Sequence, residues 1–222
     1  MTQLIVTADG SHTLFAPQFD EHYHSVHGAI AESEHVFLHA GFAHLPKYLP
    51  LVRILEMGFG TGLNAFLTCL AAKNQGRTVC YTAIEAYPIA TEQALCLNYA
   101  AQLGLPDQQP LFEALHRAAP NQQVSIQPHF CFCQQVGDLL NTELPEAHYH
   151  LLYYDAFAPT SQPELWTNAV FEQLYRALLP QGILVTYCAK GSVKRALRAA
   201  GFVLETLPGP PRKREMTRAT KP

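Results

Sequence analysis

The hydrophobic residues of this chain recur with two alternating spacings, one typical of strands and the other of helices. Short apolar runs predict strands at 52–56, 78–84, 124–133, 149–154, 182–187 and 202–206. Between them, apolar residues three and four positions apart predict helices at 63–73, 89–103, 163–178 and 192–200. Such alternation predicts an α/β fold in which helices cover both faces of a mainly parallel sheet.

The first 45 residues follow a different pattern. Apolar runs at 4–7 and 13–16 flank Asp9-Gly10, a dipeptide that favours a tight turn and therefore a β-hairpin. Helical spacing follows at 29–40. We therefore expect an N-terminal hairpin and helix extension at 1–45 and a main domain at 46–222. Residues 114–127 fit no pattern of either kind.

Composition limits the class of protein. With 222 residues, 48% hydrophobic and 15% charged, the chain can bury a full core, which excludes a disordered protein. The longest uncharged apolar stretch, 63–72, falls well short of the roughly 20 residues that a membrane span needs. We expect a cytoplasmic protein with no membrane contact, whose six cysteines are reduced.

The net charge of −3 hides an uneven distribution. Residues 1–189 carry 6 Lys or Arg against 16 Asp or Glu, a net charge of −10. Residues 190–222 carry 9 against 2, a net charge of +7. A basic tail on an acidic body predicts a polyanionic partner that meets the tail.

A glycine-rich turn is the most informative segment. Glu56 ends a predicted strand, Gly58, Gly60 and Gly62 follow at alternate positions, and Asn64 lies in the helix that the turn opens. Glycines there let the backbone approach a ligand closely. The adjacent carboxylate would repel a pyrophosphate but suits a cationic ligand, which favours S-adenosylmethionine (SAM). The alternative to a ligand-binding role is a glycine-rich turn that only permits tight packing.

Two further acidic residues follow predicted strands. Glu85 lies 27 positions after Gly58, where nucleotide-binding folds place an acid that accepts hydrogen bonds from ribose hydroxyls. Asp138 follows the third strand and could accept the exocyclic amine of adenine. A solvated strand end is the alternative for Glu85, and a helix N-cap is the alternative for Asp138.

The fourth strand ends at Asp155, followed by Phe157 and a proline-rich loop that leads to Trp166. An acid and aromatic residues at a strand tip suit group transfer to a planar base. Asp155 would orient the nucleophile, while Phe157 or Trp166 would supply a stacking surface. Alternatively, Asp155 caps the loop and Trp166 belongs to the core.

The sequence also contains two groups of residue types that can bind metals, but neither is strong evidence for a metal site. His129, Cys131 and Cys133 alternate along one predicted strand, but that strand already has the pattern of a core element. His22, His24 and His27 have no partner motif. We therefore expect no metal site. Tyr23 and the acidic run 32–34 could line a substrate entrance or form a solvated helix face.

Several longer segments resemble one family. YHSVHGAIAESEHVFL, EMGFGTGLNAFL, YYDAFAPTSQPELW, TYCAKGSVKRALRAAGF and LPGPPRKREMTRA are similar to the methyltransferase domain of the MnmC family, in its stand-alone MnmD form. The resemblance extends from about residue 23 to residue 219. It implies a class I SAM-dependent methyltransferase with a Rossmann-like fold. The implied product is 5-methylaminomethyl-(2-thio)uridine, formed from the 5-aminomethyl wobble uridine of tRNA.

The resemblance also assigns roles to residues. Glu56 and the three glycines match the family's SAM loop, Glu85 its ribose-binding acid, and Asp155 the acid of its D-x-F-A-P loop. In the bifunctional relatives an FAD-dependent oxidase domain first exposes the amine. This chain has no second dinucleotide motif, so we expect no FAD oxidase domain in it.

The implied partner is the tRNA anticodon stem-loop. We expect residues of the basic tail, including Lys190, Lys213 and Arg214, to contact its phosphates. One rival function is polyamine aminopropyl transfer, which would use the same acidic residues but gives no reason for a basic tail. The other rival is a non-catalytic RNA-binding module on a methyltransferase fold.

Overall fold

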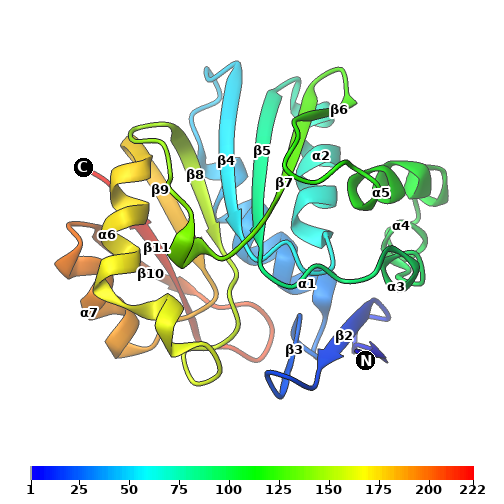
Figure 1. Ribbon diagram of the computed structural model, residues 1–222, viewed down its shortest axis with the longest axis horizontal. Coiled ribbons are helices and arrows are strands. Elements are labelled where there is room, and N and C mark those ends of the chain that lie inside the picture. Colours follow the sequence, from blue (N-terminus) through cyan, green and yellow to red (C-terminus); the bar gives the residue numbers. More distant parts are fainter. Residues whose placement is uncertain (1) are drawn as a thin grey trace.

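The computed structural model describes residues 2–222 and places an eight-stranded sheet at the centre of the molecule (Figure 1). The strands are β4 Leu51–Met57, β5 Thr78–Glu85, β6 Val124–Gln127, β7 Phe130–Val136, β8 Tyr149–Tyr154, β9 Leu178–Thr186, β10 Val203–Pro208 and β11 Glu215–Thr220. Their spatial order is β10-β11-β9-β8-β4-β5-β7-β6. The five strands from β9 to β7 are parallel, whereas β6, β10 and β11 pair antiparallel with their neighbours. The predicted mainly parallel α/β sheet is confirmed.

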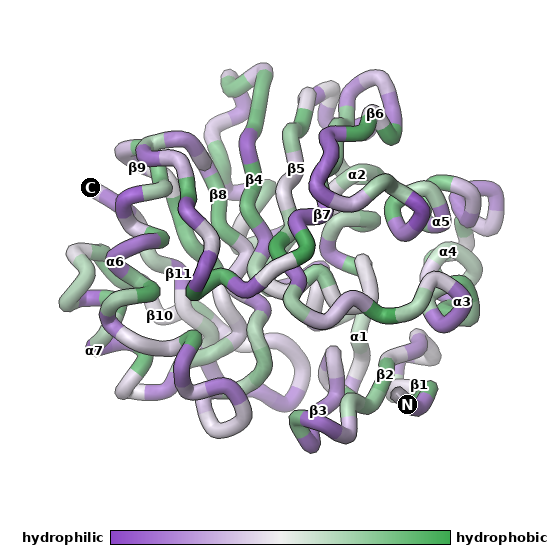
Figure 2. Tube along the Cα trace, in the orientation of Figure 1, coloured by the Kyte–Doolittle hydropathy of each residue, from purple (hydrophilic) through white to green (hydrophobic). Residues whose placement is uncertain are grey.

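Helices cover both faces of this sheet. They are α1 Ala29–Ser33, α2 Leu63–Gln75, α3 Thr91–Ala94, α4 Tyr99–Gln102, α5 Gln109–His116, α6 Asn168–Ala177 and α7 Gly191–Ala199. A π-helix at Glu34–His39 continues α1 directly. Figure 2 shows bands of both hydropathy colours along α6 and α7, as expected for helices that bury one face.

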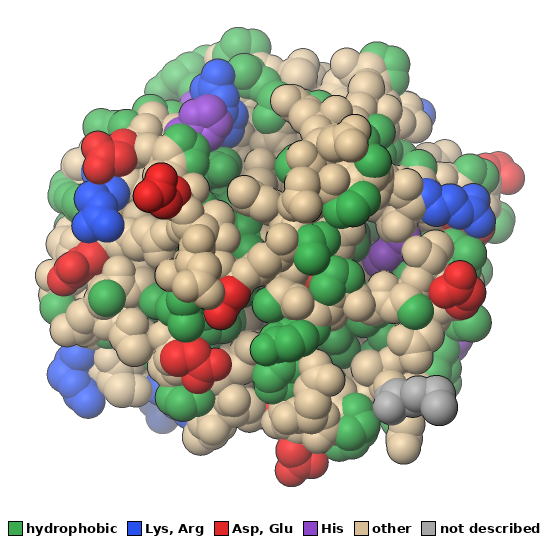
Figure 3. Space-filling view, viewed as in Figure 1, with side chains coloured by type: hydrophobic (Ala, Val, Ile, Leu, Met, Phe, Trp, Pro, Cys, Tyr) green, Lys and Arg blue, Asp and Glu red, His purple; other side chains and the backbone are tan. Residues whose placement is uncertain are grey.

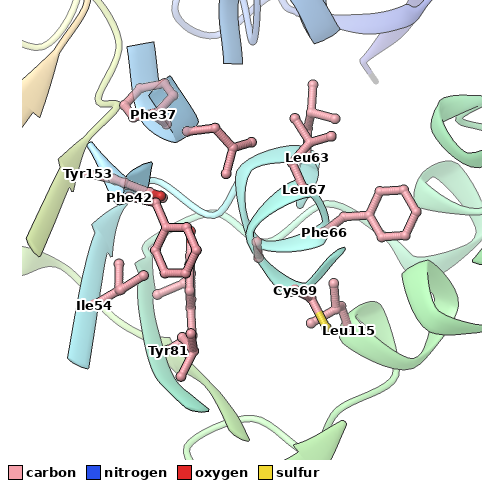
Figure 4. Packing of buried hydrophobic residues seen from close by; sticks show 14 of the residues in the cluster. Phe37, Phe42, Ile54, Leu63, Phe66, Leu67, Cys69, Tyr81, Leu115 and Tyr153 are labelled. Atoms are coloured by element: carbon pink, nitrogen blue, oxygen red, sulfur yellow. The ribbon is translucent and has the colours of Figure 1, made fainter. Parts of the chain in front are cut away.

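The period of two along the strands divides the core into two layers. Ile54 and Tyr153 point to the layer that contains α1, α2 and α5, whereas Leu55 and Tyr154 point to the layer that contains α6 and α7. Figure 4 shows the first layer, in which Phe66 of α2 faces α5. Full burial of one such side chain contributes about 1.5 to 3 kcal/mol.

The N-terminal extension forms a separate three-stranded sheet of β1 Gln3–Val6, β2 His12–Ala16 and β3 Glu21–His22. The hairpin predicted around Asp9-Gly10 is therefore confirmed. Asp9 accepts hydrogen bonds from the backbone N–H of Ser11 at 3.0 Å and of Ala31 at 3.0 Å. The turn of the hairpin is thereby tied to the first turn of α1.

Two predicted elements are interrupted in the structure. The single helix expected at 89–103 is two short helices, α3 and α4, because Asn98 between them binds the N-terminal hairpin: its side chain donates to Gly10 O at 2.9 Å and accepts from His12 N at 2.8 Å. The strand expected at 124–133 is an antiparallel pair, β6 and β7. Pro128 lies in the connecting turn, since it cannot donate to a sheet ladder.

The helix expected at 163–178 is also divided. Residues Pro163–Trp166 form a 3-10 turn, and α6 begins only after Thr167, whose side chain accepts from the Val170 N–H at 3.4 Å. Residues 114–127, which fit no sequence pattern, form the end of α5, a loop and β6. Over residues 2–222, the structure contains no helix with the length and apolar character needed to cross a bilayer.

The C-terminal segment differs most from expectation. The hydrophobic pattern predicted no strand after 202–206, yet β11 at Glu215–Thr220 lies inside the sheet between β9 and β10. Arg218 on this strand is buried and donates to both carboxylate oxygens of Glu205, at 3.0 and 2.9 Å. Lys221 donates to the carbonyl oxygens of Tyr175 and Leu178. A buried strand that contains arginine lacks the continuous apolar run by which central strands are recognised.

Candidate active site

A cavity of about 290 Å³ opens at the carboxyl ends of β4, β5 and β8. The glycine turn 58–61 and residues 155–158 form its floor, and residues 19–26 of the N-terminal extension form one wall. Tyr187 and Lys213 close the other side. This edge of an open parallel sheet is where α/β folds bind their ligands.

The glycine turn is fixed by close contacts on both sides. Gly58, Gly60 and Gly62 have φ angles of 88°, 51° and 75°, which side chains other than glycine rarely adopt. A Cβ on Gly58 would lie 2.9 Å from the Asp155 carbonyl oxygen, and one on Gly60 would lie 2.8 Å from the Tyr23 ring. These glycines are therefore required by the packing around the turn as well as by its backbone conformation.

Two histidines, the buried His24 and the half-buried His116, hold the middle of the same turn. His24 Nε2 shares a hydrogen bond of 2.6 Å with the Thr61 hydroxyl, and His116 Nε2 donates to the Thr61 carbonyl at 3.0 Å. Burial lowers the pKa of each imidazole to about 4, so both rings are neutral at pH 7. His24 was considered in the sequence only as a metal ligand, and nothing in the sequence pattern pointed to His116.

Glu85 connects the turn to the end of β5. Its carboxylate accepts the Gly60 N–H at 2.9 Å and the Tyr87 N–H at 2.8 Å, and it lines the cavity. Burial raises its pKa, while the two backbone bonds act in the opposite direction. Because each carboxylate oxygen has two acceptor sites, Glu85 can accept further hydrogen bonds from ribose hydroxyls.

Asp138 caps a short turn and also lies in the lining of the cavity. Its side chain accepts the Leu140 N–H at 3.0 Å and so caps the short 3-10 turn Leu139–Asn141. The residue also lines the cavity, on the same side as Glu85. The capping contact does not exhaust its acceptors, since a carboxylate offers four.

Glu56 lies beneath the cavity. It is fully buried and is not among the described residues that line the cavity. One oxygen accepts from Asn64 Nδ2 at 2.9 Å, and within residues 2–222 the other has no hydrogen-bond partner of ordinary geometry. Burial raises its pKa well above the ordinary value, opposed by the bond from Asn64. Glu56 therefore acts on the cavity through Asn64.

Asp155 is one of the residues that line the cavity. Asn64 Nδ2 also donates to Asp155 Oδ2 at 2.8 Å, which orients this carboxylate. Burial and the negative charge of Glu32 raise the pKa of Asp155 to about 7, against the influence of Asn64 and Lys213. The group can therefore gain or lose a proton near neutral pH, as a general base requires.

Aromatic side chains form the outer wall. Phe157 stacks on Phe19 with 4.6 Å between ring centroids and meets the edge of Tyr23 at 5.2 Å. Trp166 is 7% exposed, packs against Tyr154 and donates its indole N–H to the Phe157 carbonyl at 2.9 Å. Phe157 thus faces the cavity as expected, whereas Trp166 supports its loop from the core and offers no stacking surface.

The basic residues occupy two kinds of position. Lys190 and Arg214 are exposed, and within residues 2–222 the one acidic partner of Arg214 is Glu215, at 4.0 Å. Lys213 instead enters the cavity, where Nζ lies 2.7 Å from Glu32 Oε1 and 4.1 Å from the centroid of the Tyr187 ring. Lys213 is therefore paired inside the chain, and its contact with tRNA phosphates stays a prediction. The run 32–34 did indicate Glu32, but nothing in the sequence indicated Tyr187.

The structure brings no metal ligands together. Across the described chain, no group of three or more His, Cys, Asp or Glu side chains is arranged to hold a metal ion. The cysteines are all free, and Cys131 lies beside Cys80 on the neighbouring strand.

Comparison with known proteins places the chain among methyltransferases. The model of the S-adenosyl-L-methionine-dependent methyltransferase family matches residues 108–222, which is more than half of the chain. Two similar curated proteins, from Cupriavidus metallidurans and Ralstonia nicotianae, are both named tRNA 5-methylaminomethyl-2-thiouridine biosynthesis bifunctional protein MnmC. They are 33% and 35% identical over 96% and 95% of the chain, which spans only 33% of each relative.

The fold agrees with this assignment. The crystal structure of MNMC2 from Aquifex aeolicus matches 99% of the chain and 70% of that protein, with a TM-score of 0.76 and 24% identity. A SAM-dependent methyltransferase from Mesorhizobium loti matches 82% of the chain with a TM-score of 0.50.

Proposed function

Because the chain belongs to the S-adenosyl-L-methionine-dependent methyltransferase family, we propose that it methylates the 5-aminomethyl group of the wobble uridine in tRNA. The product would be 5-methylaminomethyl-(2-thio)uridine. The observation that carries this proposal is a carboxylate, Asp155, with a pKa of about 7 in the same cavity as the glycine turn. The names of the two bifunctional relatives support the substrate.

The residues around the turn fit SAM. Its positive charges would lie near the carboxylates of the cavity, Glu85 would accept the ribose hydroxyls, and Asp138 would accept the adenine amine. The positive φ angles of the turn favour glycine, whose lack of a side chain lets the backbone approach the cofactor closely. When bound, SAM supplies a methyl group activated by a sulfonium: the methyl carbon bonds to the amine nitrogen as its bond to sulfur breaks, leaving S-adenosylhomocysteine.

The chain's own residues would prepare the nucleophile. An alkylamine is mainly an ammonium at neutral pH, so it must lose a proton before its lone pair can attack. Asp155, oriented by Asn64, takes up that proton, and its raised pKa makes the transfer favourable. Phe157 and Phe19 provide an apolar wall against which a planar base can pack. The remaining acceleration comes from alignment of the reacting atoms.

We infer that the anticodon stem-loop approaches from the side of α7 and the turn between β10 and β11. Lys190, Arg212 and Arg214 are exposed there, next to Lys213 at the cavity wall. In the view of Figure 3, basic side chains lie at the lower left, near α7, and at other places along the margin, whereas acidic and apolar ones lie nearer the centre. The extension 1–45, which we treat as a functional unit distinct from 46–222, would cover the base from the other side.

The family assignment favours methyl transfer over polyamine aminopropyl transfer, although the carboxylates of the cavity would suit both reactions. The decisive experiment is incubation of the protein with SAM and tRNA that carries 5-aminomethyluridine, followed by nucleoside analysis. The expected product is 5-methylaminomethyluridine at the wobble position. Turnover of a polyamine with decarboxylated SAM, and none of the tRNA, would replace the proposal. SAM binding without turnover of either substrate would indicate a non-catalytic RNA-binding protein.

A further inference from the structure

The charges of the cavity are strongly unbalanced. Six carboxylates line it, on Glu21, Glu32, Glu85, Asp138, Asp155 and Glu164. Among the described lining residues Lys213 is the sole Lys or Arg. A cavity of this composition is built to receive cations, and bound SAM brings a net positive charge near the glycine turn. Away from the glycine turn, around Glu32, the remaining negative charge favours the binding of a second cation.

Glu32 has the surroundings of a binding residue. It is 6% exposed and lies in α1, where its Oε2 accepts the Ser25 N–H at 2.8 Å. That bond fixes the carboxylate while Oε1 points to Lys213 Nζ at 2.7 Å. A carboxylate held in this way by the backbone is preorganised for a charged partner.

The Lys213 ammonium shows what kind of group this position accepts. Besides its contact with Glu32, Nζ lies over the face of the Tyr187 ring, 4.1 Å from the centroid. The Tyr187 hydroxyl donates to the Ala156 carbonyl at 2.9 Å, so the ring is fixed beside the residue that follows Asp155. A carboxylate and an aromatic face together form the usual environment for an alkylammonium ion.

We propose that Glu32 and Tyr187 form the binding site for the substrate's aminomethyl ammonium, and that Lys213 occupies this site until the substrate displaces it. The inference rests on the proposed function, because it assigns a subsite to that substrate. Glu32 would receive the charged amine first, and the neighbouring Asp155 would then take its proton. Glu32 is thus a specificity-determining residue: a base without an amine cannot replace the contact that Lys213 gives up.

A purely structural reading makes a different prediction. If the ion pair only fastens the loop 209–214 to α1, removal of either partner should have the same consequence. If Lys213 stands in for the substrate, removal of Glu32 should abolish recognition of the amine, whereas removal of Lys213 should preserve or strengthen it. The two interpretations therefore predict opposite effects of removing Lys213 on recognition of the amine.

The test measures binding to protein saturated with S-adenosylhomocysteine. Two anticodon stem-loop RNAs are compared that differ only at the wobble base, 5-aminomethyluridine in one and 5-methyluridine in the other. The ratio of their dissociation constants isolates the amine, because phosphate contacts are common to both. The parent protein should prefer the amine by at least about tenfold, as a charged group meeting a buried carboxylate should.

Glu32→Gln should reduce this preference at least about fivefold, since an amide cannot match the charge but can still accept from Ser25. Lys213→Met should leave the preference intact or raise it. Glu215→Gln is the matched control: it removes the acid from a Lys194–Glu215 pair of 3.0 Å that lies outside the cavity, and the preference should not change. Binding of S-adenosylhomocysteine shows that each variant is folded.

Should Glu32→Gln fail to fold, the double variant Glu32→Gln/Lys213→Met removes both charges at once and should also lose the preference. An equal loss of preference in Lys213→Met and Glu32→Gln would overturn the inference in favour of a structural ion pair. So would a weakened affinity of Glu32→Gln for S-adenosylhomocysteine at unchanged preference, which would assign Glu32 to the cofactor. A parent protein with no preference for the amine would overturn the inference, and nucleoside analysis after incubation with SAM would then decide the proposed substrate separately.

Discussion

The two halves of the cavity are built in different ways. The half around the glycine turn consists of backbone conformation and of acids, Glu85 and Asp138, that are already held by neighbouring N–H groups. Its parts lie within 81 residues along the chain, from Gly58 to Asp138. The other half is assembled from side chains of distant segments: Tyr23 and Glu32 from the extension, Asp155 directly after β8, and Lys213 from the turn between β10 and β11.

This difference separates two tasks. A cofactor with a constant structure can be bound by a rigid local motif, because the same contacts serve every turnover. A substrate amine must be recognised, deprotonated and released, which requires groups whose charge can change. Variants in the first half should therefore alter SAM affinity, and variants in the second half should alter turnover.

The largest effect is expected for Asp155→Ala. Loss of the general base should lower the single-turnover rate of methylation by about 10² to 10⁴-fold, while SAM affinity changes by less than about threefold. Asp107→Ala, which removes an exposed acid from the 3-10 turn Pro106–Gln108, is the control and should keep the parent rate. A rate within about threefold of the parent would show that Asp155 does not position or deprotonate the amine.

Glu85→Ala tests the other half. Removal of the acceptor for ribose hydroxyls should weaken SAM binding by about 1 to 3 kcal/mol, and loss of the bond to Gly60 adds to the effect. Calorimetric titration with SAM measures it, with the exposed Glu92→Ala as the control. At saturating SAM the rate of methyl transfer should stay near that of the parent, and a rate that collapses despite saturation would break the separation between the halves.

A smaller effect concerns the exposed basic turn. Replacement of Arg212 and Arg214 together by alanine should flatten the dependence of log tRNA affinity on log salt by up to about 1.5 to 2 units, since each phosphate contact releases counterions. SAM affinity should not change. Arg117→Ala, an exposed arginine paired with Glu113 on α5, serves as the control. The same salt slope in parent and double variant would move tRNA docking to another face.

The smallest effect is one of stability. The pKa of Asp155 in the folded protein is about 7, above its ordinary value of 3.8, so the folded state binds a proton that the unfolded state releases. The contribution of Asp155 to stability is therefore present at acidic pH and lost as pH rises from about 4 to 7. Asp155→Asn stays neutral throughout. Its Tm relative to the parent should rise between pH 5 and pH 8, and a constant difference would contradict the raised pKa.

The same contrast explains what the sequence could reveal. The glycine turn and Glu85 were predictable because a short motif fixes their backbone and spacing. Asp155 and Phe157 were also predictable, since they follow directly after an apolar strand. Trp166 could not be assigned between core and cavity, because its role depends on which way one side chain turns. Lys213 was predicted to contact phosphates. Its pairing with Glu32 could not be predicted, because the two residues are 181 positions apart and their contact leaves no local pattern.

Strand β11 was missed for a related reason, and its position has a consequence for how the protein folds. Among the described strands, β10 lies at the edge of the sheet and pairs with β11, which in turn pairs with β9. During synthesis the ribosome therefore releases β9 and β10 before the strand that must come between them. Until β11 inserts, β9 has one unpaired edge with apolar residues on both faces, a template for association with other chains. The nascent protein is therefore open to aggregation in the interval between synthesis of β10 and insertion of β11.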